Sequence, residues 1–111
     1  MVIVNNAVYV DGYKSVESKS LKETYERIRN QDGLAWIDLY RPTEEEFTSV
    51  AKEFRLHELA VEDAIQAHQR PKIERYGDTL FVVLRPARYL DAPEEVEFSE
   101  VHVFVGENFV V

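Results

Sequence analysis

Two neighbouring carboxylates, Glu62 and Asp63, are the residues of this sequence whose types most clearly suggest chemistry. Carboxylate oxygens are the ligands that hard divalent cations prefer. Adjacent side chains on a helix diverge by about 100°, so both could reach one cation only beyond the helix end, or where a partner surface closes the site. Because charged helix residues usually face water, the spacing alone favours two solvated carboxylates over a shared cation site.

The histidines give no catalytic pattern. His57-Glu58 is similar to the opening of the zinc-protease motif, but the second histidine that this motif requires is replaced by Val61. We therefore expect His57 to cap or flank a helix. His102, between two valines of a predicted strand, is expected to face solvent. The sequence also lacks a Gly-x-Ser-x-Gly elbow and a glycine-rich phosphate loop, so nothing identifies a catalytic triad or a nucleotide site.

Two further groups of charged residues are interpreted as surface features. The acidic group is predicted to form a solvated loop and strand edge: Asp91, Glu94, Glu95, Glu97 and Glu100. The basic group has no interleaved aromatic residues and is expected to form ion pairs within the chain or between subunits: Arg70, Lys72, Arg75, Arg85 and Arg88.

Composition narrows the possible classes of protein. The chain has 111 residues, of which 45% are hydrophobic, so we expect one folded domain. The formal net charge of −8 argues against a nucleic-acid partner, because phosphate contacts need a surplus of positive charge. The absence of cysteine excludes disulfides and thiolate chemistry. No signal peptide or membrane-spanning apolar stretch is recognisable, which predicts a soluble, intracellular chain.

The elements that would hold the candidate residues follow from capping, turn and periodicity signals. Capping boxes at Ser20 and Thr43 predict two helix starts, and a third helix is predicted over 58–66. A turn is predicted at Asn5-Asn6. The predicted strands cover 2–4, 7–10, 34–40, 72–76, 79–89 and 98–105. This order predicts an α/β layered domain with a mixed sheet covered by helices, and the apolar strand at 109–111 suggests a piece of a longer protein.

Three stretches are informative when taken together: FRLHELAVEDA at 54–64, HQRPK at 68–72 and YGDTLFVVLR at 76–85. They resemble the CorA family of magnesium and cobalt transporters. The likeness is specific over 54–89, looser to Val111 and weak before Phe54, although Trp36-Ile37-Asp38-Leu39 suits the family's preceding strand.

The resemblance implies that residues 1–111 form the N-terminal cytoplasmic, regulatory domain of a homopentameric channel, with an α/β/α layout. The transmembrane part and its Gly-Met-Asn motif are absent, so any membrane contact would come through the missing C-terminal part, at the cytoplasmic face of the inner membrane. Glu62 and Asp63 match the acidic pair that the family uses to sense intracellular cations between subunits, completed by a stalk aspartate outside this chain. The implied ligand is a weakly held regulatory Mg²⁺, or Co²⁺, and the implied protein is not an enzyme.

Two alternatives remain at this point. One is a zinc-transporting relative of the same family, because the segments that would separate the two transporters are not in this sequence. The other is a small metal-dependent hydrolase that uses Glu62, Asp63 and His68.

Overall fold

The structure is a computed structural model that describes residues 2–18, 20–30, 33–66, 69–92 and 94–111. Its helices are α1 (Leu21–Asn30), α2 (Glu44–Glu53) and α3 (Glu58–Ile65). Its strands are β1 (Val2–Val10), β2 (Tyr13–Glu17), β3 (Leu34–Tyr40), β4 (Lys72–Tyr76), β5 (Thr79–Leu84), β6 (Ala87–Leu90), β7 (Glu95–Phe98), β8 (Val101–Val105) and β9 (Phe109–Val110). No helix among these residues is long and apolar enough to cross a lipid bilayer.

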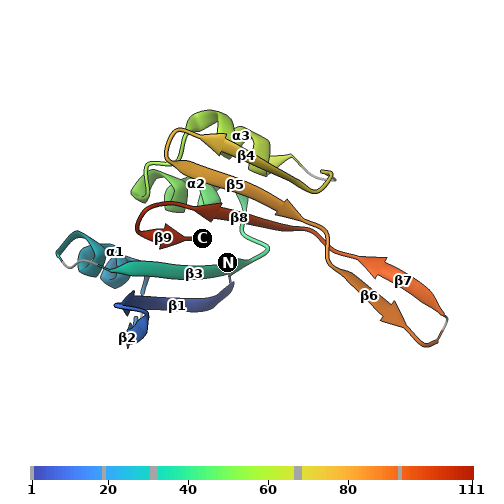
Figure 1. The fold of residues 1–111 in the computed structure, drawn as a ribbon, viewed down its shortest axis with the longest axis horizontal. Helices are drawn as coiled ribbons and strands as arrows, with labels where there is room; N and C mark the ends of the chain where they lie inside the picture. Colours follow the sequence, from blue (N-terminus) through green and yellow to red (C-terminus); the bar gives the residue numbers. More distant parts are fainter. Residues whose placement is uncertain (1, 19, 31–32, 67–68, 93) are drawn as a thin grey trace.

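Seven strands form one mixed sheet, in the order β2-β1-β3-β9-β8-β5-β4 (Figure 1). Only the β3–β9 pair is parallel among the pairings described, and it joins an N-terminal antiparallel group to a C-terminal one. Strands β6 and β7 pair only with each other, as a hairpin that extends away from the body of the molecule. We call residues 87–98 the arm.

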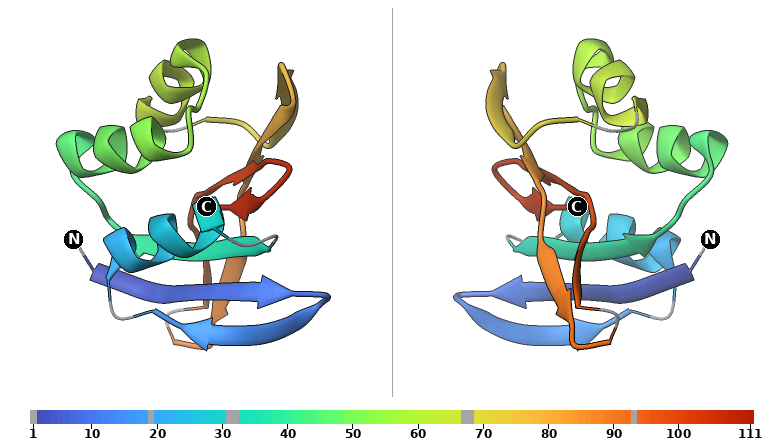
Figure 2. Two further views of the ribbon diagram at one scale, coloured as in Figure 1. Left: turned by 90° about the vertical axis from the view of Figure 1, so that its left-hand side faces the viewer. Right: turned by 90° about the vertical axis from the view of Figure 1, so that its right-hand side faces the viewer.

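All three helices pack on the same face of the sheet (Figure 2). The core between them is apolar and centres on Phe81 and Phe104, whose rings stack with centroids 4.8 Å apart. Phe47 of α2 lies 5.5 Å from the ring of Phe104. The α/β class with a mixed sheet, predicted from the sequence, is confirmed.

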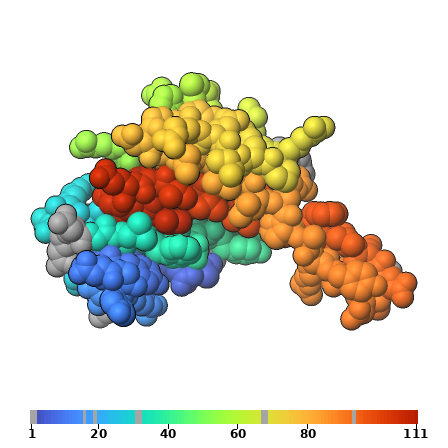
Figure 3. Space-filling model, in the orientation of Figure 1, coloured from blue at the N-terminus to red at the C-terminus, as the bar shows by residue number. Residues whose placement is uncertain are grey.

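The opposite face of the sheet, seen in Figure 3, is covered by no helix of the described residues. Large apolar side chains are exposed on strands of the sheet: Ile73 is 71% exposed and Leu84 is 50% exposed. Among the described residues, helices therefore cover one face of the sheet.

The predicted turn at Asn5-Asn6 is wrong, because β1 runs unbroken through both residues. Both asparagine side chains have a hydrogen-bond partner distant in sequence: Asn5 donates to Asp38 Oδ2 of β3 at 2.6 Å, and buried Asn6 accepts from the hydroxyl of Thr24 in α1. The hairpin turn lies instead at Asp11-Gly12, where both residues have positive φ, as this type of turn requires.

The predicted strand over 79–89 is in fact two strands, separated at Arg85-Pro86. Proline has no N–H to donate to a neighbouring strand, which ends β5 at Leu84. The predicted strand over 98–105 is divided in the same region, into β7 and β8. These two breaks create the arm.

The predicted helix starts are close to those observed. The Thr43 hydroxyl accepts from the Glu46 amide at 3.1 Å, while the Glu46 carboxylate accepts from the Thr43 amide at 3.0 Å. This hydrogen bond from the Thr43 backbone lowers the pKa of Glu46. Ser20 Oγ likewise accepts from the amide of Glu23 at the start of α1. The capping residues therefore set both helix starts.

Candidate functional site

Helix α3 positions the acidic pair through its cap and its apolar face. His57 is the N-cap, and its Nδ1 accepts a hydrogen bond from the Leu59 amide at 3.1 Å, which confirms the expected capping role. Ala60 is fully buried against the core, with Val61 and Ala64 packed beside it. This orientation leaves Glu62 exposed to solvent.

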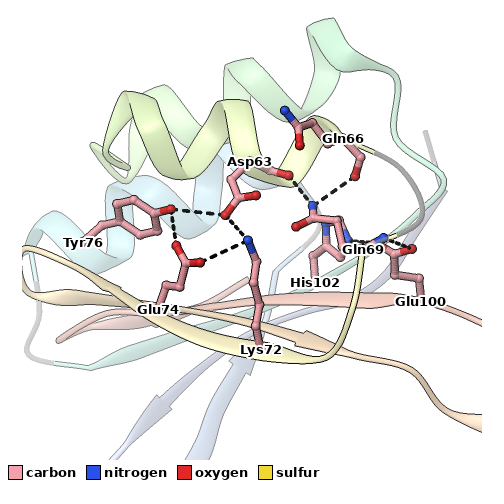
Figure 4. A network of polar contacts seen from close by, with 8 residues as sticks. All are labelled: Asp63, Gln66, Gln69, Lys72, Glu74, Tyr76, Glu100 and His102. Carbon is pink, nitrogen blue, oxygen red and sulfur yellow. Dashed lines mark hydrogen bonds and ion pairs between the residues drawn. The ribbon is translucent and has the colours of Figure 1, made fainter.

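Strand β4 supplies the surface that faces Asp63. In a strand, alternate residues share one face, so Lys72, Glu74 and Tyr76 lie together, and Ile73 and Arg75 lie on the other side. Figure 4 shows the first three side chains directed toward α3. Burial of the apolar face of α3 thus brings a helix carboxylate over a row of polar strand residues.

Asp63 is held by a cation and a phenol. Its Oδ2 atom lies 2.5 Å from Lys72 Nζ and accepts from the Tyr76 hydroxyl at 3.2 Å. Glu74 completes the group, with Oε1 at 3.3 Å from Lys72 Nζ and Oε2 at 2.6 Å from the Tyr76 hydroxyl (Figure 4). The Asp63 side chain is 17% exposed and that of Lys72 27%, so water screens this pair less than a surface pair.

The pKa values of the cation and the phenol reflect these partners. The hydrogen bond to Asp63 raises the pKa of the Lys72 ammonium, against the opposing effect of burial. The hydrogen bond to Glu74 and burial raise the pKa of the Tyr76 hydroxyl, and the bond to Asp63 adds to the same effect. Lys72 therefore stays charged and Tyr76 stays a neutral hydrogen-bond donor at physiological pH.

A second polar group, joined to the first through Gln69, fixes the approach to β4. The Gln69 side-chain amide donates to the carbonyl oxygens of Asp63 and Gln66, which belong to the last turn of α3 and its C-cap. The Asp63 carbonyl also accepts from the Gln66 backbone amide at 3.3 Å, so Gln69 adds a second donor at the C-terminal end of α3 and acts as a side-chain cap there. Arg85 Nη1 donates to the Gln69 carbonyl at 3.1 Å.

Glu100 ties the same segment to β8. It accepts from the Gln69 amide, and its Oε1 lies 2.5 Å from His102 Nε2. Burial raises the pKa of Glu100, but the hydrogen bonds to His102 and Gln69 outweigh that effect and hold the pKa below its ordinary value. The expectation that His102 faces solvent is wrong: its side chain is 22% exposed, and its ring packs edge-on against Phe81.

The structure does not bring the carboxylates of the predicted acidic pair together. Glu62 is exposed and Asp63 faces β4, so the two carboxylates diverge, as adjacent helix residues do. Within the described ranges, no group of three or more His, Asp or Glu side chains could hold a metal ion. His68, named for the hydrolase alternative, lies outside the described residues.

The other charged residues named in the sequence analysis are either bonded near the α3–β4 site or exposed. Lys72 and Arg85 bond within the chain, as expected for the basic group, whereas Arg70, Arg75 and Arg88 are exposed. Four of the predicted acidic residues are exposed on or beside the arm: Asp91, Glu94, Glu95 and Glu97. Glu100 departs from that expectation, because it is bonded to His102 and Gln69.

The sequence interpretation missed Gln69, Glu74 and Tyr76 as members of this site. The signal for the strand residues was the alternation of polar side chains at 72, 74 and 76 within a period-two segment. Carboxylate oxygens are the ligands that Mg²⁺ prefers, but in this set both carboxylates already contact the Lys72 ammonium.

Comparison with known proteins identifies the family of this chain. The sequence pattern of the family described as CorA-like Mg2+ transporter protein matches residues 31–111. The chain belongs to the CorA family. This confirms the resemblance found over 54–89 and extends it upstream into the region before Phe54.

CorA relatives of known sequence are much longer than this chain. YfjQ of Bacillus subtilis is 37% identical over 87 residues, which cover 78% of this chain and 26% of the relative. The cobalt/magnesium transport protein CorA of Thermotoga maritima is 34% identical over 62 residues, covering 56% and 18% respectively. The chain thus spans about a quarter or less of these two relatives.

Solved CorA structures share the fold. The soluble domain of CorA from Methanocaldococcus jannaschii superposes with a TM-score of 0.61 over 99% of this chain and 40% of that one, at 15% identity. The complete CorA magnesium transporter of the same organism gives a TM-score of 0.62 over 99% and 32%, at 14% identity. The α/β fold is therefore that of the CorA soluble domain.

Proposed function

We propose that this chain is a regulatory domain of a divalent-cation transporter and senses intracellular Mg²⁺, or the similar Co²⁺, where neighbouring subunits meet. Asp63 would contact the cation directly or through its water, with Glu62 beside it. The observation that carries the proposal is the position of Asp63 in a chain of the CorA family. It is a partly buried carboxylate held near a second carboxylate, Glu74, and a phenol on rigid elements.

The proposed mechanism is electrostatic. The described residues provide one carboxylate-rich half of a site, and the other half would come from a neighbouring copy in a homopentamer. Like charges about 4 Å apart repel by about 4 kcal/mol at an effective dielectric constant of about 20. A divalent cation between two subunits removes that repulsion and holds the ring closed. When intracellular Mg²⁺ falls, the cation leaves, the subunits separate and the pore opens.

The conducting segments would lie outside this chain, in membrane-spanning parts of the longer protein. The sensing domain would sit at the cytoplasmic face of the membrane, where it meets the Mg²⁺ concentration that it regulates. In this proposal the domain binds cations and catalyses no reaction. Because Mg²⁺ keeps several waters and uses few protein ligands, a weak site is expected, and its occupancy can follow the cellular concentration.

The test uses the complete gene product that contains this chain, purified with its membrane segments. Limited proteolysis across a Mg²⁺ titration measures closure of the ring. Asp63→Asn should lose most of the Mg²⁺-dependent protection, while Glu97→Gln, an equal charge change on the exposed arm, should keep it. Equal protection of Asp63→Asn and wild type would refute the sensing role.

The hydrolase alternative is separated by a second assay of the same preparations. Metal-dependent turnover of simple phosphate or carboxylate esters, lost in Asp63→Asn, would favour an enzyme. Ion-uptake measurements with Mg²⁺, Co²⁺ and Zn²⁺ would separate a magnesium/cobalt transporter from the zinc-transporting alternative.

A further inference from the structure

We propose that Lys72 is a built-in competitor of the divalent cation at Asp63, and that Glu74 receives the Lys72 ammonium when the cation binds. This inference rests on the proposed sensing function and adds its regulation. It starts from one observation: the Asp63 oxygen that would meet a cation is already 2.5 Å from Lys72 Nζ, which also lies 3.3 Å from Glu74 Oε1.

The geometry puts the two cations in competition for one carboxylate. Both hydrogen bonds described for the Asp63 side chain end on the same atom, Oδ2, and one comes from Lys72 (Figure 4). A divalent cation at that oxygen would place two positive charges within contact distance, at a partly buried position where repulsion is strong. Binding at Oδ2 requires the ammonium to leave, and binding at Oδ1 of the same carboxylate is opposed by the nearby ammonium charge.

Glu74 gives the displaced ammonium a place to go. Lys72 and Glu74 are two residues apart on the same face of β4, and their charged groups are already in contact. The Lys72 ammonium also lies 5.6 Å from the centre of the buried Phe81 ring, which holds it close to the core. The ammonium can thus move from Asp63 to Glu74 while this anchoring persists.

Tyr76 couples the two carboxylates. Its hydroxyl lies within hydrogen-bond distance of Asp63 and of Glu74, but it has one proton to donate. When Lys72 pairs with Glu74, the hydroxyl no longer has to satisfy that carboxylate. It can then support Asp63 as a cation ligand.

The consequence is a site whose affinity is reduced by its own lysine. If only a fraction of molecules leaves Asp63 free, the apparent dissociation constant rises by the inverse of that fraction. This reduction would keep the sensor half-occupied at cellular Mg²⁺ concentrations, where a site without Lys72 would be saturated.

The experiment measures the Mg²⁺ concentration at half-maximal protease protection in the complete gene product. Lys72→Met should lower that midpoint by about fivefold or more, a typical coupling between two binding events. The matched control is Lys22→Met, which removes the same charge from an exposed position on α1 and should leave the midpoint within about twofold of wild type. A Lys72→Met midpoint equal to or above that of Lys22→Met would overturn the proposal.

Glu74→Gln tests the receiving role and keeps the proposal testable if Lys72→Met folds poorly. It should raise the midpoint in the wild-type background, more than Glu97→Gln does, and have little effect in the Lys72→Met background. An equal increase in both backgrounds would show that Glu74 acts only through its charge and would refute its role as receiver.

Asp63→Asn separates the two proposals. If Asp63→Asn loses protection while the Lys72 and Glu74 variants behave like their controls, sensing stands and the competition is refuted. If Asp63→Asn keeps full protection, sensing fails, and the competition fails with it.

Discussion

Two regions of this molecule are rich in carboxylates, yet they differ in almost every other respect. In the α3–β4 corner, Asp63 and Glu74 share an ammonium and a phenol on rigid elements packed over the core. On the arm, Glu95 and Glu97 extend from a two-stranded hairpin whose residues pair with one another. The arm carries the longer acidic run, but the corner has the partners and the burial.

The difference shows that acidic composition is a poor guide to a cation site. An exposed carboxylate is well solvated and gains little from one more counter-ion. A partly buried carboxylate with an internal counter-ion has already lost part of its hydration. Exchanging that counter-ion for another cation therefore changes the contacts around the carboxylate. The predictions below test this contrast between corner and arm.

The largest expected effect separates the core beneath the corner from the apolar face of the arm. Phe81 is fully buried, and Phe81→Ala should lower the free energy of unfolding by about 3–5 kcal/mol through lost transfer energy and a cavity. Phe98 of the arm is 61% exposed and pairs with Ala87, so Phe98→Ala should cost below about 1 kcal/mol. Urea denaturation measures both changes in the free energy of unfolding. Similar losses for the two variants would contradict the contrast between corner and arm.

The next effect concerns the carboxylates themselves. Asp63→Asn removes the partner of a partly buried ammonium and should lower the free energy of unfolding by about 1–3 kcal/mol, because charged hydrogen bonds contribute more than neutral ones. Glu97→Gln should change it by less than about 0.5 kcal/mol. Both are measured by urea denaturation in metal-free buffer at neutral pH. If Asp63→Asn left the free energy of unfolding unchanged, Glu74 alone would be a sufficient partner for the Lys72 ammonium.

The local features of both regions could be predicted from sequence, because their causes are local. The capping boxes at Ser20 and Thr43 involve residues three apart, and His57 caps α3 through an amide two residues away. The α/β class followed from the order of periodic segments, and the acidic residues of the arm were correctly expected to be exposed.

Apart from the strand break at Arg85-Pro86, which has a local cause, the errors arose where a residue distant in sequence supplies the deciding contact. Asn5-Asn6 looks like a turn, but their side chains are satisfied by Asp38 and Thr24, which are 33 and 18 residues away respectively. The contact of Asp63 with Lys72 depends on packing α3 against β4, which no spacing rule specifies. His102 looked solvated because the Phe81 ring that packs against it comes from the neighbouring strand β5.

A smaller effect is expected from pH, through Glu100. Its pKa is below the ordinary value in the folded chain, so its contribution is present above the ordinary pKa, near pH 4.3, and is lost as pH falls through the folded value. Glu100→Gln should therefore flatten the acid side of the stability profile, measured by thermal unfolding between about pH 3 and 6. Glu97→Gln is the control, and equal flattening by both variants would contradict the assignment to Glu100.

The smallest effect is expected from removing the arm altogether. Its two strands form a separate sheet, and the Ser99 amide donates to the Pro86 carbonyl at 2.9 Å, which closes its base. Replacing residues 87–98 by Asn-Gly shortens that loop, a change whose entropy is worth about 0.6 kcal/mol per doubling of length. Going from twelve residues to two is about two and a half halvings of length, so the shorter loop favours folding by about 1.5 kcal/mol. The lost cross-strand pairs of the arm, such as exposed Tyr89 with Val96, oppose this by about 0.2–1 kcal/mol each, so the net shift in the free energy of unfolding, measured by urea denaturation, should be below about 1 kcal/mol. A loss as large as that of Phe81→Ala would show that the arm supports the body. The contrast between a structural corner and a dispensable arm would then fail.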